Sequence, residues 1–131
     1  MKQIVLMLAL LLTSSTSVVF ANESNELFSK AETSEVMQLI DNICGDTWCE
    51  GDYNFKFINL ACDKHAKSCD LSFHFIKRDE QSVEIYSPIQ VCHFDNIHTF
   101  KQIKDSEFSL NENFYDDLNN CIGNFEAKVQ F

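Results

Sequence analysis

The sequence predicts a small, disulfide-stabilised α+β domain with an N-terminal helix, a three-stranded antiparallel meander and a C-terminal helix packed on one face. Helical spacing of apolar residues occurs near both ends of the mature chain, and strand-like alternation lies between them. The chain also carries an even number of cysteines, six in 131 residues. With 45% apolar residues, three glycines and one proline, the composition excludes a disordered or collagen-like chain.

Residues 1–21 have the features of a secretory signal peptide. Lys2 supplies the positive charge, Ile4–Leu12 form an apolar run, and the stretch ending in Ala21 suits cleavage before Asn22. A helix of about nine residues spans only ~14 Å, whereas a bilayer needs about 20 residues. We therefore expect a single secreted or periplasmic domain, residues 22–131, with no membrane anchor after cleavage.

The charge of the chain restricts its partners. Twenty acidic residues against ten basic ones give a formal net charge of −10 at pH 7. Such a surface repels phosphate backbones and anionic lipid headgroups. We therefore expect a protein or a small ligand as partner, and no nucleic acid.

In an exported domain, six cysteines predict disulfides, for which 15 connectivities exist. Their spacing favours two pairs that are close in sequence and one long-range pair. The predicted pairs are Cys44–Cys49, Cys62–Cys69 and Cys92–Cys121. On the chain-entropy model each short loop contributes roughly 2 kcal/mol and the long one roughly 3.5 kcal/mol.

The first predicted helix covers Ser24–Ile43. Its buried stripe has the spacing i, i+3, i+4, i+7 and consists of Val36, Leu39, Ile40 and Ile43. An earlier apolar patch is out of phase, and Thr33-Ser34-Glu35 offers a second start, so the segment is either two helices or one kinked helix. Glycine suits a helix C-terminus, so we expect the end near Cys44-Gly45.

A β-hairpin is predicted from Tyr53–Cys62 and Cys69–Lys77. If Cys62 faces Cys69, one face of the hairpin becomes apolar, because Leu60 then faces Leu71 and Ile58 faces Phe73. The aromatic residues of the first strand, Tyr53, Phe55 and Phe57, have the opposite parity to Ile58 and Leu60. Either a bulge near Phe57 or burial of both faces explains this parity.

The rest of the chain predicts one more strand and one more helix. The strand covers Ser82–Cys92, and Pro88 requires it to lie on an edge or to be broken there. Phe94–Phe108 fits either a short irregular helix or a packed loop. Ser109 and Glu112 have capping-box spacing and start the last helix. The stripe of that helix consists of Leu110, Phe114, Leu118, Cys121, Ile122 and Phe125.

The most distinctive stretch is the loop between the first helix and the hairpin, which holds the only tryptophan. The loop is either a disulfide-closed connector whose Trp48 covers the edge of the core, or a recognition loop that presents Trp48 to a partner, because exposed aromatic residues anchor interfaces. The candidate binding residues are Asp46, Trp48, Glu50, Asp52 and Tyr53. A calcium loop starting at Asp46 would place Trp48 at the third position and Phe57 at the twelfth, where oxygen ligands are required, so we predict no metal there.

Histidines suggest two further sites. Cys62, His65, Cys69 and His74 resemble zinc ligands by type, but an exported chain would oxidise these cysteines. His93, Asp95 and His98 form a polar triplet suited to general acid–base catalysis.

No nucleophile motif accompanies the histidines, so the sequence favours a non-enzymatic binding domain without cofactor, acting as an inhibitor, effector or accessory factor. The alternative is a small secreted hydrolase that uses His93, Asp95 and His98, with or without a metal.

Overall fold

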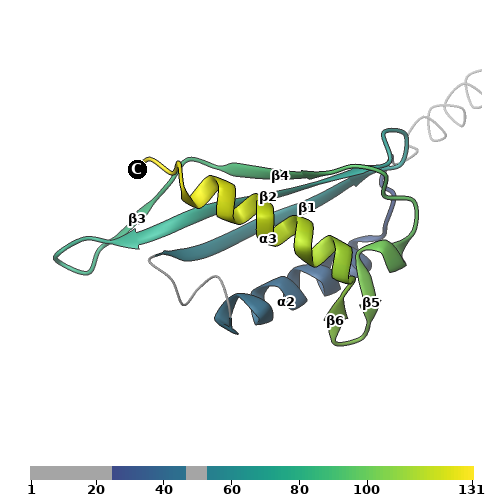
Figure 1. The fold of residues 1–131 in the computed structure, drawn as a ribbon, viewed down its shortest axis with the longest axis horizontal. Helices are drawn as coiled ribbons and strands as arrows, with labels where there is room; N and C mark the ends of the chain where they lie inside the picture. Colours follow the sequence, from purple (N-terminus) through teal and green to yellow (C-terminus); the bar gives the residue numbers. More distant parts are fainter. Residues whose placement is uncertain (1–24, 47–52) are drawn as a thin grey trace, which may run out of the picture.

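The computed structural model of the chain describes residues 25–46 and 53–131, so the predicted signal peptide lies outside the described residues (Figure 1). Within these residues the fold is α+β, with two α-helices, antiparallel sheets and two disulfides. The helices are α2 (Lys30–Asp46) and α3 (Glu112–Glu126). The main sheet contains β1 (Asn54–Asp63), β2 (Ser68–Arg78), β3 (Glu84–Tyr86) and β4 (Gln90–Phe94). A second sheet contains β5 (Lys104–Ser106) and β6 (Ser109–Leu110), next to the 3-10 helix η2 (Phe100–Gln102).

Helix α2 begins at Lys30 because Ser29 caps it. The Ser29 hydroxyl accepts a hydrogen bond from the Glu32 amide at 3.1 Å, and the Glu32 carboxylate accepts one from the Ser29 amide at 3.0 Å. The predicted start at Ser24 is therefore wrong, and no second start occurs at Thr33. The helix also continues to Asp46, beyond the expected end at Cys44-Gly45.

The hairpin β1–β2 has the predicted register at its closed end, where Cys62 pairs with Cys69 and Leu60 with Leu71. The expected pairing of Ile58 with Phe73 is wrong, because a bulge between Phe57 and Asn59 sets Phe57 opposite Phe73. The bulge leaves Ile58 44% exposed. It also brings Phe57 onto the face of Leu60, which resolves the conflict of parity in the sequence.

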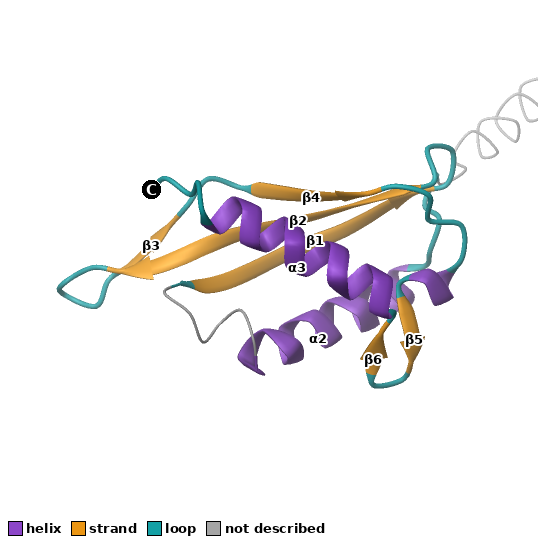
Figure 2. Ribbon diagram, in the orientation of Figure 1, coloured by secondary structure: helices purple, strands orange, loops and turns teal. Residues whose placement is uncertain are grey.

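The predicted third strand is both broken and on an edge. Its two halves, β3 and β4, pair with the same side of β2, and Pro88 lies between them. Ser87 completes the ladder at the break: its amide donates to the Phe75 carbonyl at 2.9 Å, and its hydroxyl accepts from the Phe75 amide at 2.9 Å. These two bonds keep the ladder to β2 continuous where a loop joins β3 to β4 (Figure 2).

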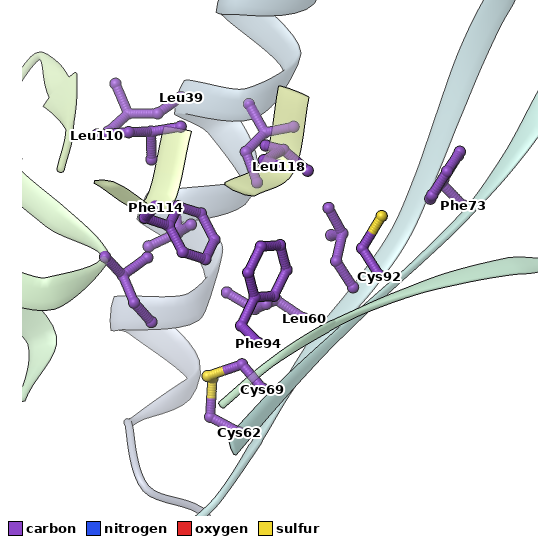
Figure 3. Close-up of a cluster of buried hydrophobic side chains, with 14 of the residues drawn as sticks. Leu39, Leu60, Cys62, Cys69, Phe73, Cys92, Phe94, Leu110, Phe114 and Leu118 are labelled. Carbon is purple, nitrogen blue, oxygen red and sulfur yellow. A yellow bond between two sulfur atoms is a disulfide. The ribbon is translucent and has the colours of Figure 1, made fainter. Parts of the chain in front are cut away.

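One hydrophobic core joins the sheet to both helices. Along β2, Leu71, Phe73 and Phe75 are fully buried, while the residues between them face away from the core. Helix α2 contributes residues such as Ile40, and α3 contributes residues such as Leu118. Figure 3 shows Phe94 of β4 against Phe114 of α3, with ring centroids 4.5 Å apart.

The segment before α3 forms more structure than its sequence indicated. After η2, residues 104–110 make a small hairpin, so Ser109 belongs to β6 and not to a helix cap. Asn111 is the cap: its side-chain oxygen accepts hydrogen bonds from the amides of Asn113 at 2.9 Å and Phe114 at 3.3 Å. Leu110 is buried as expected, but from the hairpin.

Two of the predicted disulfides are present among the described residues. Cys62–Cys69 joins β1 to β2, with Cα atoms 4.0 Å apart, and Cys92–Cys121 joins β4 to α3, with Cα atoms 6.0 Å apart. Cys49 lies outside the described residues, so the pair Cys44–Cys49 stays a prediction. No cysteine within residues 25–46 and 53–131 is free.

Loss of the long-range disulfide is expected to destabilise the domain more than loss of the short one. The Cys92–Cys121 pair spans 29 residues of sequence and Cys62–Cys69 spans 7, so closing the longer loop removes more entropy from the unfolded chain. C92A/C121A should lower the free energy of unfolding by about 3.5 kcal/mol and C62A/C69A by about 2 kcal/mol. Urea unfolding of both double variants checks this, and the reverse order would contradict it.

The two candidate caps of α3 can be separated by mutation. N111A should lower the free energy of unfolding by about 1 kcal/mol, because two amides of the first turn lose their acceptor. S109A removes only an exposed hydrogen bond to Ser106 and should cost less than about 0.5 kcal/mol. Equal losses in thermal unfolding would show that Asn111 is not the main cap.

Candidate functional site

The predicted contact loop is described only at its ends. Trp48, Glu50 and Asp52 lie outside the described residues, and Asp46 is the last residue of α2. The Tyr53 ring packs on the core: its centroid is 5.6 Å from that of Phe75 and 5.4 Å from that of Phe131. This residue therefore supports the sheet, and the partner contact proposed for the loop stays a prediction.

The histidine triplet is only partly assembled. The His93 Nε2 lies 2.8 Å from the Asp95 carboxylate, as its spacing allows. The Nδ1 atom lies 2.6 Å from the carboxylate of Asp70, which comes from β2 and pairs with His93 across the strands. His98 is not part of this group; its backbone amide donates a hydrogen bond to the side-chain oxygen of Gln102 at 2.6 Å. We refer to Asp70, His93 and Asp95 as the His93 cluster.

The His93 cluster favours the charged form of the imidazole. Hydrogen bonds to Asp70 first and to Asp95 second raise the pKa of His93 above its ordinary value of 6.5. A protonated ring donates through both nitrogens, and each nitrogen here has a carboxylate as acceptor. A general base or a metal ligand needs a nitrogen lone pair, and both ring nitrogens of His93 already have a carboxylate partner.

The four residues that resemble zinc ligands in the sequence, Cys62, His65, Cys69 and His74, do not form a metal site. Cys62 and Cys69 share a disulfide, so neither is a thiolate ligand. The His65 ring bonds to the Asn25 side chain at 3.0 Å, and the His74 ring bonds to the Ser87 carbonyl at 2.6 Å. Within the described parts of the chain, no group of three or more histidine, cysteine, aspartate or glutamate residues is placed to hold a metal ion.

A groove runs between α2 and the outer strand of the sheet, β1. One part has a volume of about 680 Å³, and an adjoining part has about 410 Å³. The two parts share Lys30, Thr33 and Asn59, so they form one continuous surface, which we call the α2–β1 groove. Its further lining includes Glu26, Ala61, Asp63 and Asp70 in the larger part, and Met37, Gln38, Asp41, Phe57 and Ile58 in the smaller one.

The floor of this groove includes a strand edge. Residues 25–27 cover one end of it, where the Leu27 amide donates to the Cys62 carbonyl at 2.9 Å and the Lys64 amide to the Asn25 carbonyl at 2.8 Å. Alternate residues of an antiparallel strand direct their backbone groups to the same side, so the amide and carbonyl of Leu60 also point to this outer edge. Leu60 lies in the groove, beyond the covered end.

The opposite edge of the sheet is protected. Strands β3 and β4 are short, and Pro88 with its missing amide separates them. Breaks, short strands and proline all reduce pairing with another chain. Strand β1 is longer, with ten residues, and its edge is interrupted only by the bulge at Ile58. The α2–β1 groove therefore follows the more accessible edge.

The α2–β1 groove is acidic. Among the described residues, Glu26, Asp41, Asp63 and Asp70 line it together with one ammonium group, that of Lys30; Asp70 is also paired with His93. Hydrogen bonds from the backbone amides of Ala66 and His65 lower the pKa of Asp63, so this carboxyl stays ionised.

Asp41 differs from the other carboxylates of the groove. Partial burial raises the pKa of its carboxyl, and no described group donates a hydrogen bond to it or pairs with its charge. An exposed carboxylate without a counter-charge attracts a cation.

Sequence reasoning did not identify this groove. Its lining comes from the polar stripe of α2 and from the edge of β1, which in sequence look like ordinary solvated surfaces. Asp70 was likewise missed as a partner of His93, because only the β2–β4 register brings them together. The bulge suggested by the aromatic parity was the one available signal, since bulges occur at edges and near sites.

Comparison with protein-family models, with curated proteins and with solved structures found no match to this chain. In the described part of the chain, neither helix has the length and apolar character needed to cross a membrane.

The raised pKa of His93 predicts a pH dependence of stability. Because the folded-state pKa exceeds the unfolded value of 6.5, the cluster stabilises the fold fully below about pH 6.5 and loses this contribution as the pH rises through the folded pKa. NMR titration should give His93 a pKa above 6.5, and D70N should bring it back towards 6.5.

Unfolding experiments test the same linkage. Between pH 5.5 and 8.5, H93Q should show a smaller loss of stability than the unaltered protein, because it no longer releases this proton. H98Q serves as the control and should retain the loss. A His93 pKa at or below 6.5 would contradict the proposed charge state.

Proposed function

We propose that this chain is an exported, non-enzymatic domain that binds another protein through the α2–β1 groove. The predicted leader supports secretion or transport to a periplasm, and the two disulfides are consistent with an oxidising environment. The single observation that carries the proposal is the continuity of the groove beside the accessible edge of β1.

The character of the groove favours a protein partner over a small ligand. Small-molecule sites are enclosed and mostly apolar. This groove instead extends along a helix and a strand, and most of its lining residues are polar or charged. A protein segment can follow such a surface over its length and satisfy its polar groups.

The hydrolase alternative receives no support from the His93 cluster. His93 is engaged by two carboxylates, and His98 is not placed with them. A catalytic base at this position would need to give up one of its hydrogen bonds and lose a proton that both carboxylates stabilise. We therefore assign the cluster to charge compensation on the open face of an acidic sheet.

Site-specific crosslinking tests the proposed contact surface. A photoreactive benzoylphenylalanine at Gln38, which is exposed in the groove, should give a defined higher-mass adduct in the native compartment. The same group at Asp116, exposed on α3, is the matched control and should give none. The partner, identified by mass spectrometry and purified, should bind the unmodified protein, and M37R should raise its Kd at least about tenfold.

Two results would contradict the proposal. One is adduct formation at Asp116 with none at Gln38, which would place the contact elsewhere. The other is an unchanged Kd in M37R while its thermal unfolding matches that of the unaltered protein.

A further inference from the structure

We propose that the α2–β1 groove takes an extended, basic segment of the partner, which adds to the edge of β1 and places a lysine or arginine side chain on Asp41. This inference rests on the proposed function and specifies the chemistry of the partner. Three independent features of the described residues carry it: an accessible strand edge, an uncompensated carboxylate, and an apolar strip between them.

The accessible edge of β1 favours a partner segment in an extended conformation. The chain itself shows that this edge accepts pairing, because residues 25–27 already add to it in antiparallel fashion at Asp63. A partner segment would continue this row towards the bulge at Ile58, with its backbone bonded to the amide and carbonyl of Leu60. The bulge limits the pairing to a short stretch, so side chains must supply most of the selectivity.

The carboxylates of the α2–β1 groove favour a basic partner segment. Four carboxylates and one ammonium of the described residues line the groove; Asp70 is paired with His93, whereas Asp41 has no counter-charge among the described residues. A lysine or arginine side chain beside Asp41 would form an ion pair with this exposed carboxylate. An acidic segment would instead meet the repulsion of the groove and of a chain with net charge −10.

Apolar groups next to Asp41 provide the remaining contacts. Met37, Phe57 and Ile58 line the same part of the groove as Asp41. Met37 and Phe57 are half-buried, and Ile58 is 44% exposed. Side chains of an extended segment alternate in direction, so a basic residue on Asp41 leaves its neighbours at i±2 on the same side, within reach of these apolar groups.

A second copy of this chain is the competing occupant, since two β1 edges could pair with each other. The net charge of −10 on each copy opposes that association. Sedimentation of the oxidised mature protein should therefore show a monomer. A dimer that D41N leaves intact and I58K disrupts would overturn the proposal in favour of self-pairing.

The proposal is tested with a phage-displayed library of random linear nine-residue peptides, selected on the oxidised mature protein. Enriched peptides should carry lysine or arginine at a fixed position with apolar residues two positions away. A synthetic copy of the most enriched peptide should bind D41N about three- to fivefold more weakly, as expected for loss of an exposed ion pair. It should bind D116N, the control on α3, with unchanged affinity.

Backbone methylation then tests the extended mode. N-methylation of alternate peptide amides should weaken binding at least about tenfold if those amides bond to β1, and methylation of the intervening amides should change it little. The proposal fails if basic residues are not enriched, if D41N and D116N bind alike, or if methylation has no effect. Should these tests fail while crosslinking at Gln38 and M37R succeed, the protein-binding function stands and only the assigned partner chemistry is wrong.

Discussion

The pairing of β1 with β2 is the constraint on which the other features depend. Cys62 and Cys69 lock the closed end of the hairpin, and the bulge at Ile58 corrects the register further along. A shift of one residue would turn Phe73 from the core to solvent. The same pairing makes β2 the central strand, so that β4 aligns His93 with Asp70 and β1 remains at the edge beside α2.

The acidic residues of the protein lie in two different electrostatic environments. On the open face of the sheet, Asp70 and Asp95 share the charge of His93, so repulsion between the carboxylates is compensated internally. In the α2–β1 groove, Asp41 has no such compensation within the described chain. This difference separates a cluster that supports the fold from a surface that favours an external cation.

The two edges of the main sheet also differ: one is protected from pairing with another chain, and the other is accessible. Pro88 interrupts the row of β3 and β4, and Ser87 closes the ladder there from within the chain. On the other side residues 25–27 cover only one end of β1. An accessible edge is a liability unless a partner uses it, and this edge lies in a groove whose charge would exclude another copy of the chain.

The sequence by itself determined the features that depend on neighbours along the chain. Periodicity located the helices and the hairpin, and cysteine spacing together with alternation predicted the register at Cys62 and Cys69. Only the tertiary structure decided which residue caps each helix. Ser29 follows the bridge between Glu26 and Asp63, and Asn111 follows the β5–β6 pairing, so each helix begins after these pairings end. It also decided that Asp70 bonds to His93, 23 residues away, and that α2 lies beside the edge of β1. Such contacts depend on packing between distant segments, which local patterns do not encode.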